Sequence, residues 1–120
     1  MADPLHFHGG VHPWENKDRT RGSAIREAPL LETYTVPLQQ HIGAPAKLLV
    51  KKKDTVRRGQ RVADPGGFVS AAIHAPTSGT VKAVDDVQGP SGAKLPCITI
   101  ESDGDDTPAD ELEPIADWEN

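Results

Sequence analysis

The feature that most constrains the fold is an internal repeat in the middle of the chain. When residues 44–56 are shifted by 31 positions onto residues 75–87, six of the thirteen aligned positions are identical. This repeat predicts two similar β-units related by a pseudo-two-fold axis, each burying its apolar face against the other. The identical pairs are Ala44 with Ala75, Pro45 with Pro76, Val50 with Val81, Lys51 with Lys82, Asp54 with Asp85 and Val56 with Val87.

Short strands joined by tight turns are predicted around this repeat. In residues 31–38, Tyr34 and Val36 alternate with two threonines, which is typical of a strand that ends at Pro37. Further strands are expected within four segments, and eleven glycines and eleven prolines provide the turns between them. No window has the apolar period of an amphipathic helix, so the predicted fold is all-β. The four segments are 47–63, 68–76, 79–87 and 90–102.

The charge distribution predicts three regions. Residues 1–100 contain all 13 lysines and arginines with nine acidic residues, whereas residues 101–120 contain nine acidic residues and no basic one. Residues 1–29 have no sustained period and are expected to form an extended arm that packs on the domain. The domain itself is expected at 30–103, and residues 104–120 read as an acidic, flexible tail or linker.

Several functional classes are excluded by composition. The single cysteine, Cys97, cannot form an internal disulfide or hold an iron–sulfur cluster. No apolar run is long enough to span a membrane. There is no Ser-His-Asp arrangement and no pair of carboxylates in a structured region, so we predict no catalytic, cofactor-binding or metal-binding residue.

One motif links the repeat to a known scaffold. The segment "HAPTSGTV" (74–81), together with "LLVKKKDTVRRGQRVA" (48–63), resembles the biotinyl/lipoyl pattern. In that family a modified lysine lies at the tip of the hairpin between Val62 and Pro76. Here that position falls near Phe68, and no lysine occurs between Lys53 and Lys82. The resemblance therefore implies the scaffold without biotin or lipoate.

A closer resemblance covers residues 7–106. The segments "FHGGVHP", "IREAPL", "VPLQQHIGAPAKLLVKKKDTVRRGQRVAD", "GFVSAAIHAPTSGTVKAV" and "PCITIESDGDD" occur in that order. Together they resemble the N-terminal barrel-sandwich hybrid domain of the RnfC family, found in the Rnf electron-transport complex, which is similar to a module of the sodium-translocating NADH:quinone reductases. Lys53 departs from the glycine usual before Asp54, which leaves the turn type open, although Asp54 can still bond the local backbone.

This resemblance implies a place in a membrane-bound, ion-pumping NADH:ferredoxin oxidoreductase. In that family, domains that bind FMN, NADH and two 4Fe-4S clusters follow this module. The chain is accordingly expected to be an excised domain, with a stand-alone protein as the alternative. The implied partners are the remaining domains of the subunit, other subunits and ferredoxin, and the implied location is the cytoplasmic face of a prokaryotic membrane. Which ion is pumped does not follow from the residues.

Two surfaces are candidates for docking. The first combines the arm with the "QQHIG" segment, through Gly9, Gly10, His12, Pro13, Gln40 and His41. The second is a basic turn containing Lys51, Lys52, Lys53, Arg57 and Arg58. The alternative role of these basic residues is to keep an exposed turn soluble. His6, His8 and His12 read as structural or adventitious, because ligation needs fixed geometry and this segment is expected to be flexible.

Two functional hypotheses follow. The first is a non-catalytic scaffold or docking module of an electron-transfer subunit. The second is a free-standing binding module that uses the basic turn, residues 51–58, for nucleic acid or an acidic protein. Nucleic acid is the less expected partner, because this stretch lacks the interleaved aromatic residues that stack on bases.

Overall fold

The computed structural model describes residue 10 and residues 13–112 of the chain. Within these residues it contains seven strands, one short 3₁₀ helix, η1 (Lys17–Arg19), and no α-helix. The larger sheet has the order β1 (Thr33–Pro37), β7 (Lys94–Ser102), β6 (Gly79–Gln88) and β3 (Thr55–Val56). The smaller sheet has the order β2 (Lys47–Leu48), β4 (Arg61–Asp64) and β5 (Ile73–His74). All neighbouring strands are antiparallel, and the predicted all-β class is confirmed.

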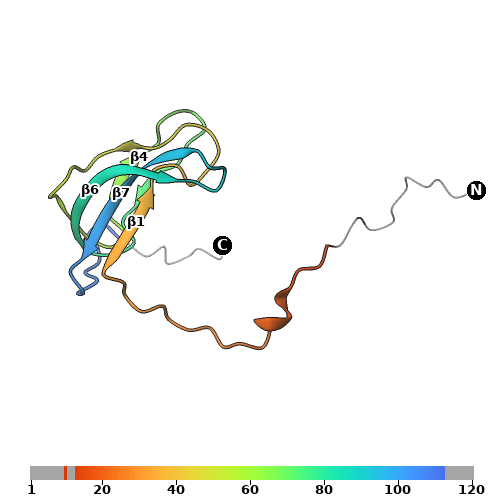
Figure 1. The fold of residues 1–120 in the computed structure, drawn as a ribbon. Helices are drawn as coiled ribbons and strands as arrows, with labels where there is room; N and C mark the ends of the chain where they lie inside the picture. The colour runs from red at the N-terminus through yellow and green to blue at the C-terminus, as the bar shows by residue number, and fades with distance from the viewer. Residues whose placement is uncertain (1–9, 11–12, 113–120) are drawn as a thin grey trace, which may run out of the picture.

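A long hairpin of β6 and β7 organises the larger sheet (Figure 1). Its strands pair from Gly79 opposite Ser102 to Gln88 opposite Lys94, and the register shifts between Val81 and Ala83. Such a bulge bends the strand. Only the first part of β6 contributes buried side chains, whereas most of its later residues are exposed. The hairpin therefore begins in the core and continues beyond it.

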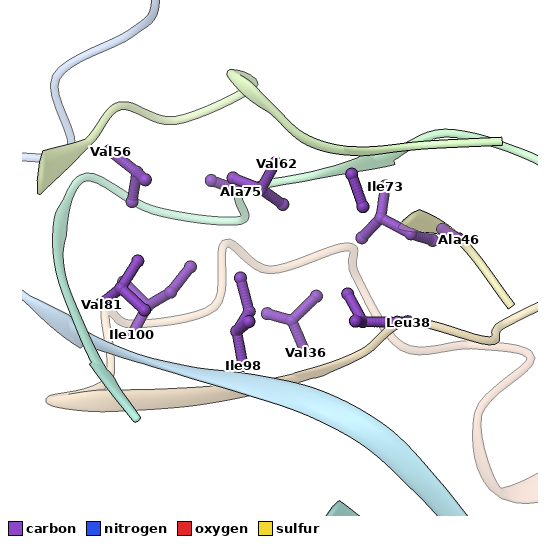
Figure 2. Packing of buried hydrophobic residues seen from close by; sticks show 11 residues of the cluster. Val36, Leu38, Ala46, Val56, Val62, Ile73, Ala75, Val81, Ile98 and Ile100 are labelled. Carbon is purple, nitrogen blue, oxygen red and sulfur yellow. The ribbon is translucent and has the colours of Figure 1, made fainter. Parts of the chain in front are cut away.

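The core lies between the two sheets and is built from small aliphatic side chains (Figure 2). The larger sheet contributes Ile98 and Ile100, which are fully buried, and the smaller sheet contributes Val62. Because these side chains are β-branched, they suit a pleated, half-buried surface. The whole buried cluster is Val36, Leu38, Ala46, Val56, Val62, Ala63, Ile73, Ala75, Val81, Ile98 and Ile100.

The predicted strands appear where the apolar alternation is clear and shorten where it is not. The strand expected to end at Pro37 is β1, with Val36 buried. The strand expected over residues 68–76 is reduced to Ile73 and His74, because residues 65–72 instead form a loop against residues 41–46. The first copy of the repeat supplies β2 and β3 to different sheets, whereas the second supplies most of β6.

The segments outside the sheets differ in how they relate to the domain. Residues 13–31 are exposed throughout, and this segment leads away from the sheets (Figure 1). Its large apolar side chains, Trp14 and Ile25, are exposed and do not contribute to the core. At the other end, residues 106–109 lie against the domain, with a parallel bridge between Arg58 and Pro108 and with Ala109 buried. The first part of the acidic segment is thus docked.

Candidate functional site

The basic turn is held in place by backbone hydrogen bonds to β6. The Lys53 amide donates to the Val81 carbonyl at 2.7 Å, and the Val81 amide donates to the Asp54 carbonyl at 2.9 Å. Asp54 also accepts a hydrogen bond from the Lys51 amide at 2.9 Å through Oδ2. Lys53 takes the left-handed backbone conformation, with φ of 79°, where glycine is usually favoured. The expected local bond from Asp54 is therefore present, and it supports a turn with a lysine at the strained position.

The arginines that follow the turn are matched by carboxylates. Arg57 pairs with Asp110, and the Arg58 Nε atom lies 2.9 Å from Asp106 Oδ2. The Arg58 amide donates to the Thr107 carbonyl, and the Ala109 amide donates back to the Arg58 carbonyl, both at 2.9 Å. These contacts bring the acidic segment onto the arginines, which reduces the positive charge they offer to an external partner.

The three lysines of the turn remain the cationic part of this surface. Lys51, Lys52 and Lys53 are exposed, and no carboxylate among residues 13–112 lies within 4.0 Å of their ammonium groups. The structure thus divides the predicted basic surface in two, with open lysines at 51–53 and neutralised arginines at 57 and 58.

Gln40 and His41 take part in local hydrogen bonds of the "QQHIG" segment. The Gln40 side-chain amide donates to the Pro37 carbonyl at 3.1 Å. The His41 Nε2 atom accepts a hydrogen bond from the Ala71 amide at 3.2 Å, so the ring proton is assigned to Nδ1, which donates to the Ile42 carbonyl at 2.9 Å. Both residues help to order this loop through hydrogen bonds.

The arm and the "QQHIG" segment are not brought together among the described residues. Gly10, with φ of 76°, and Pro13 are exposed, and residues 13–31 lead away from the sheets (Figure 1). Gly9 and His12 lie outside the described residues, as do His6 and His8. A shared docking surface of these residues with Gln40 and His41 therefore stays a prediction.

The loop that would carry the lysine of a biotinyl or lipoyl domain presents apolar side chains instead. Phe68 is fully exposed (105%), and Val69 is half exposed (49%). On the neighbouring loop, Ile42 is also exposed (82%). We call Ile42, Phe68 and Val69 the apolar tip. Phe68 was predicted near the carrier position of the hairpin, whereas Ile42 and Val69 were not singled out from the sequence.

A hydrogen-bonded group of polar residues, Ser78, Asp103, Asp105 and Thr107, lies at the end of β7, and we call it the polar latch. The Ser78 hydroxyl donates to Asp103 Oδ1 at 2.6 Å and accepts from the Thr107 amide at 2.8 Å. The Asp105 amide also donates to Asp103 Oδ1 at 2.9 Å. The hydrogen bonds from Ser78 and Asp105 lower the pKa of the Asp103 carboxyl, because they stabilise its charged form. The latch orders the start of the acidic segment and has no feature of a catalytic site.

Cys97 does not fit an iron–sulfur cluster. Its side chain is buried in β7, and burial, followed by the nearby charges of Asp85 and Asp86, raises the pKa of the thiol above its ordinary value of 9.0. A buried neutral thiol is poorly suited to metal ligation, which requires thiolate. Within the described part of the chain, no group of three or more His, Cys, Asp or Glu side chains is placed to hold a metal ion. No helix there has the length and hydropathy needed to cross a membrane.

Comparison with known proteins places this arrangement in context. The family model described as the RnfC barrel sandwich hybrid domain matches residues 5–105. The subunit designated C of the ion-translocating oxidoreductase complex of Pseudomonas aeruginosa is 50% identical over 100 residues, which are 82% of this chain and 13% of that protein. The corresponding subunit of the proton-translocating ferredoxin:NAD(+) oxidoreductase complex of Clostridium ljungdahlii is 40% identical over 112 residues, 93% of this chain and 24% of that protein.

A third relative extends the same pattern to a complex that translocates another ion. The corresponding subunit of the Na(+)-translocating ferredoxin:NAD(+) oxidoreductase complex of Acetobacterium woodii is 41% identical over 114 residues, covering 95% of this chain and 26% of that protein. The chain thus spans between about one eighth and one quarter of the length of these relatives. Most of each relative lies outside the matched segment.

Proposed function

Because the chain belongs to the RnfC barrel sandwich hybrid domain family, we propose that it is the N-terminal module of the RnfC subunit of an Rnf-type ferredoxin:NAD oxidoreductase complex, where it acts as a non-catalytic scaffold or docking domain. The family match over residues 5–105 is the observation that carries this proposal. The module would help to hold the redox domains of its subunit at a defined spacing, which electron transfer requires.

The redox groups of the complex belong to other parts of the subunit in this proposal. The family resemblance assigns FMN, NADH and two 4Fe-4S clusters to the segments that follow the module. The residues here do not fit a cluster, because Cys97 is single and buried. In this proposal the chain provides structural support and docking contacts to its subunit.

The proposed location follows from the complex. The relatives are named as ion-translocating complex subunits, so we place this domain at the membrane through its partner subunits, on the cytoplasmic face where NADH is found. Ferredoxin is a candidate partner for the open lysines at 51–53, because complementary charge steers the association of an acidic electron carrier. The ion that the complex moves is not assigned.

Deletion of the module from the full-length subunit tests this proposal. We expect the shortened subunit to keep its FMN and iron content and to reduce an artificial acceptor with NADH, but to lose ferredoxin-linked activity or assembly into the complex. A matched control is the full-length subunit with Lys51, Lys52 and Lys53 changed to serine, which should assemble normally. Loss of FMN or iron from the shortened subunit, or full ferredoxin-linked activity without the module, would contradict the scaffold role.

The alternative function uses the basic turn for nucleic acid or an acidic protein, and the open lysines at 51–53 are the observation that favours it. Binding to nucleic acid would weaken steeply with salt, with a slope set by the number of phosphates contacted. Titration of the 120-residue chain with a mixed-sequence RNA and DNA at two salt concentrations separates the two hypotheses. Tight, salt-dependent binding that the triple serine variant abolishes would favour the alternative.

A further inference from the structure

The apolar tip is an unusual surface for this chain. Of all residues, 26% are charged, yet residues 38–46 and 65–73, the two stretches that form and flank the tip loops, contain no Asp, Glu, Lys or Arg. At the tip, Phe68 and Ile42 expose nearly their whole side chains. An exposed aromatic side chain beside other apolar groups typically marks an interaction site.

The tip is rigid. The Ala44 amide donates to the Val69 carbonyl at 3.0 Å, and the Ser70 hydroxyl donates to the Ala44 carbonyl at 2.8 Å. Gly43 has φ of 91°, and a Cβ atom there would collide with the Val69 carbonyl, so the close approach of the two loops requires glycine. The hydrogen bond from the Ala71 amide to His41 joins the two loops at a second point. A loop backbone held in this way loses little conformational freedom on binding.

We propose that the apolar tip, formed by Ile42, Phe68 and Val69, is the anchor through which this module docks into an uncharged apolar recess on the rest of its own subunit. This inference rests on the proposed function. The relatives contain about three to seven times more polypeptide than the matched segment, so a partner surface on the same chain is available. Covalent linkage gives a high effective concentration, and a small anchor is then sufficient for stable docking.

Other occupants fit the tip less well. A bilayer with anionic lipids would be expected to contact basic residues next to the aromatic side chain. The lysines of the basic turn instead lie near Val81, at the opposite end of the core from Ala46, which adjoins the tip (Figure 2). A second copy of the chain would need roughly 800 Å² of interface on each partner, which three side chains do not provide.

Photo-crosslinking in the intact complex tests the proposal. Position 68 of the full-length subunit carries benzoylphenylalanine in place of Phe68. A control carries it at position 84, because Val84 is half exposed and lies on β6, outside the two tip loops. We expect position 68 to crosslink to a downstream segment of the same subunit and position 84 to give at least roughly tenfold less product there. As a positive control, benzoylphenylalanine at Leu112 should react near Gly59, which it contacts.

The outcomes separate this inference from the proposed function. The assignment of the partner would be overturned if position 68 crosslinked to lipid, to another subunit or to a second copy of the module. It would also be overturned if position 68 gave no crosslink while the Leu112 control reacted. Failure of the whole subunit to purify with the complex would instead contradict the proposed function. As a second measurement, Phe68→Ser should increase proteolysis of the segment after the module at least roughly threefold, whereas Phe68→Leu should not. Equal proteolysis in both variants would also overturn the inference.

Discussion

The imidazole of His41 accepts a hydrogen bond from the backbone amide of Ala71, thirty residues further along the chain, at 3.2 Å. This contact joins the loop that follows β1 to the loop between β4 and β5, and the apolar side chains of the tip project from these two loops. A histidine that could have been assigned to catalysis or metal binding thus has a structural role. The tip depends on it for part of its order.

His41→Ala should loosen the tip without unfolding the domain. Loss of one exposed hydrogen bond corresponds to about 1 kcal/mol, so we expect the Ala71 amide to exchange with solvent roughly fivefold faster. Hydrogen exchange followed by NMR measures this rate. Gln40→Ala is the matched control, because that side chain bonds Pro37 and makes no bond to the second loop. Equal exchange at Ala71 in both variants would show that His41 does not order the tip.

Lys53→Gly should stabilise the domain. Lys53 has φ of 79°, a conformation that costs a residue with a Cβ atom on the order of 1–2 kcal/mol. Glycine avoids that strain but loses more entropy on folding, so the expected net gain is up to about 1 kcal/mol in the free energy of unfolding. Urea denaturation measures it. Lys52→Gly, next to it in the turn, should be neutral or destabilising, and a K53G variant no more stable than K52G would contradict the prediction.

The latch at Asp103 should make stability depend on acidic pH. Its pKa in the folded protein lies below the ordinary value of 3.8, so the unfolded chain binds the proton more readily. The carboxylate therefore contributes stability above about pH 4, and this contribution is lost as the pH falls through the folded pKa. In Asp103→Asn, the part of the stability loss at acidic pH that comes from this carboxylate should disappear.

Urea unfolding between about pH 7 and pH 3 measures this slope. Glu27→Gln, in the exposed arm, controls for the change in net charge. If the D103N protein loses stability on acidification as steeply as the unchanged protein, the hydrogen bonds from Ser78 and Asp105 do not stabilise the carboxylate.

Ala109→Asp should release the docked part of the acidic segment. Ala109 is buried and its amide donates to the Arg58 carbonyl, so a carboxylate there would have to leave water. Burial of a polar group without a partner costs about 1–3 kcal/mol, which is enough to detach a segment held by a few contacts. Glutamyl endopeptidase should then cleave after Glu111, which both variants retain, several times faster.

Asp110→Ser provides the control for this experiment. That change removes only the exposed ion pair with Arg57, which is worth about 1 kcal/mol or less. Its cleavage rate should stay near that of the unchanged protein. A rate in A109D equal to that in D110S would mean that the buried contact at Ala109 does not hold the segment.

Local patterns were sufficient for much of the fold. The alternation around Tyr34 and Val36 predicted β1 and its end at Pro37, because a strand with one buried face has a period of two. The local hydrogen bond that Asp54 accepts from the Lys51 amide could likewise be expected, since it spans three residues. The shortening of β5 could not, because the loop before it is held by Ala44, on a segment that is distant in sequence.

The same distinction applies to the candidate surfaces. Residue types in their order along the chain were enough to predict the strand-rich scaffold, the absence of a lysine at the carrier position and the family to which the chain belongs. The folded arrangement was needed to show that Arg58 faces Asp106 and that Ile42 lies on a loop beside Phe68 and Val69. Those pairings join segments far apart in the chain, so they are set by how the two sheets pack and not by any local preference.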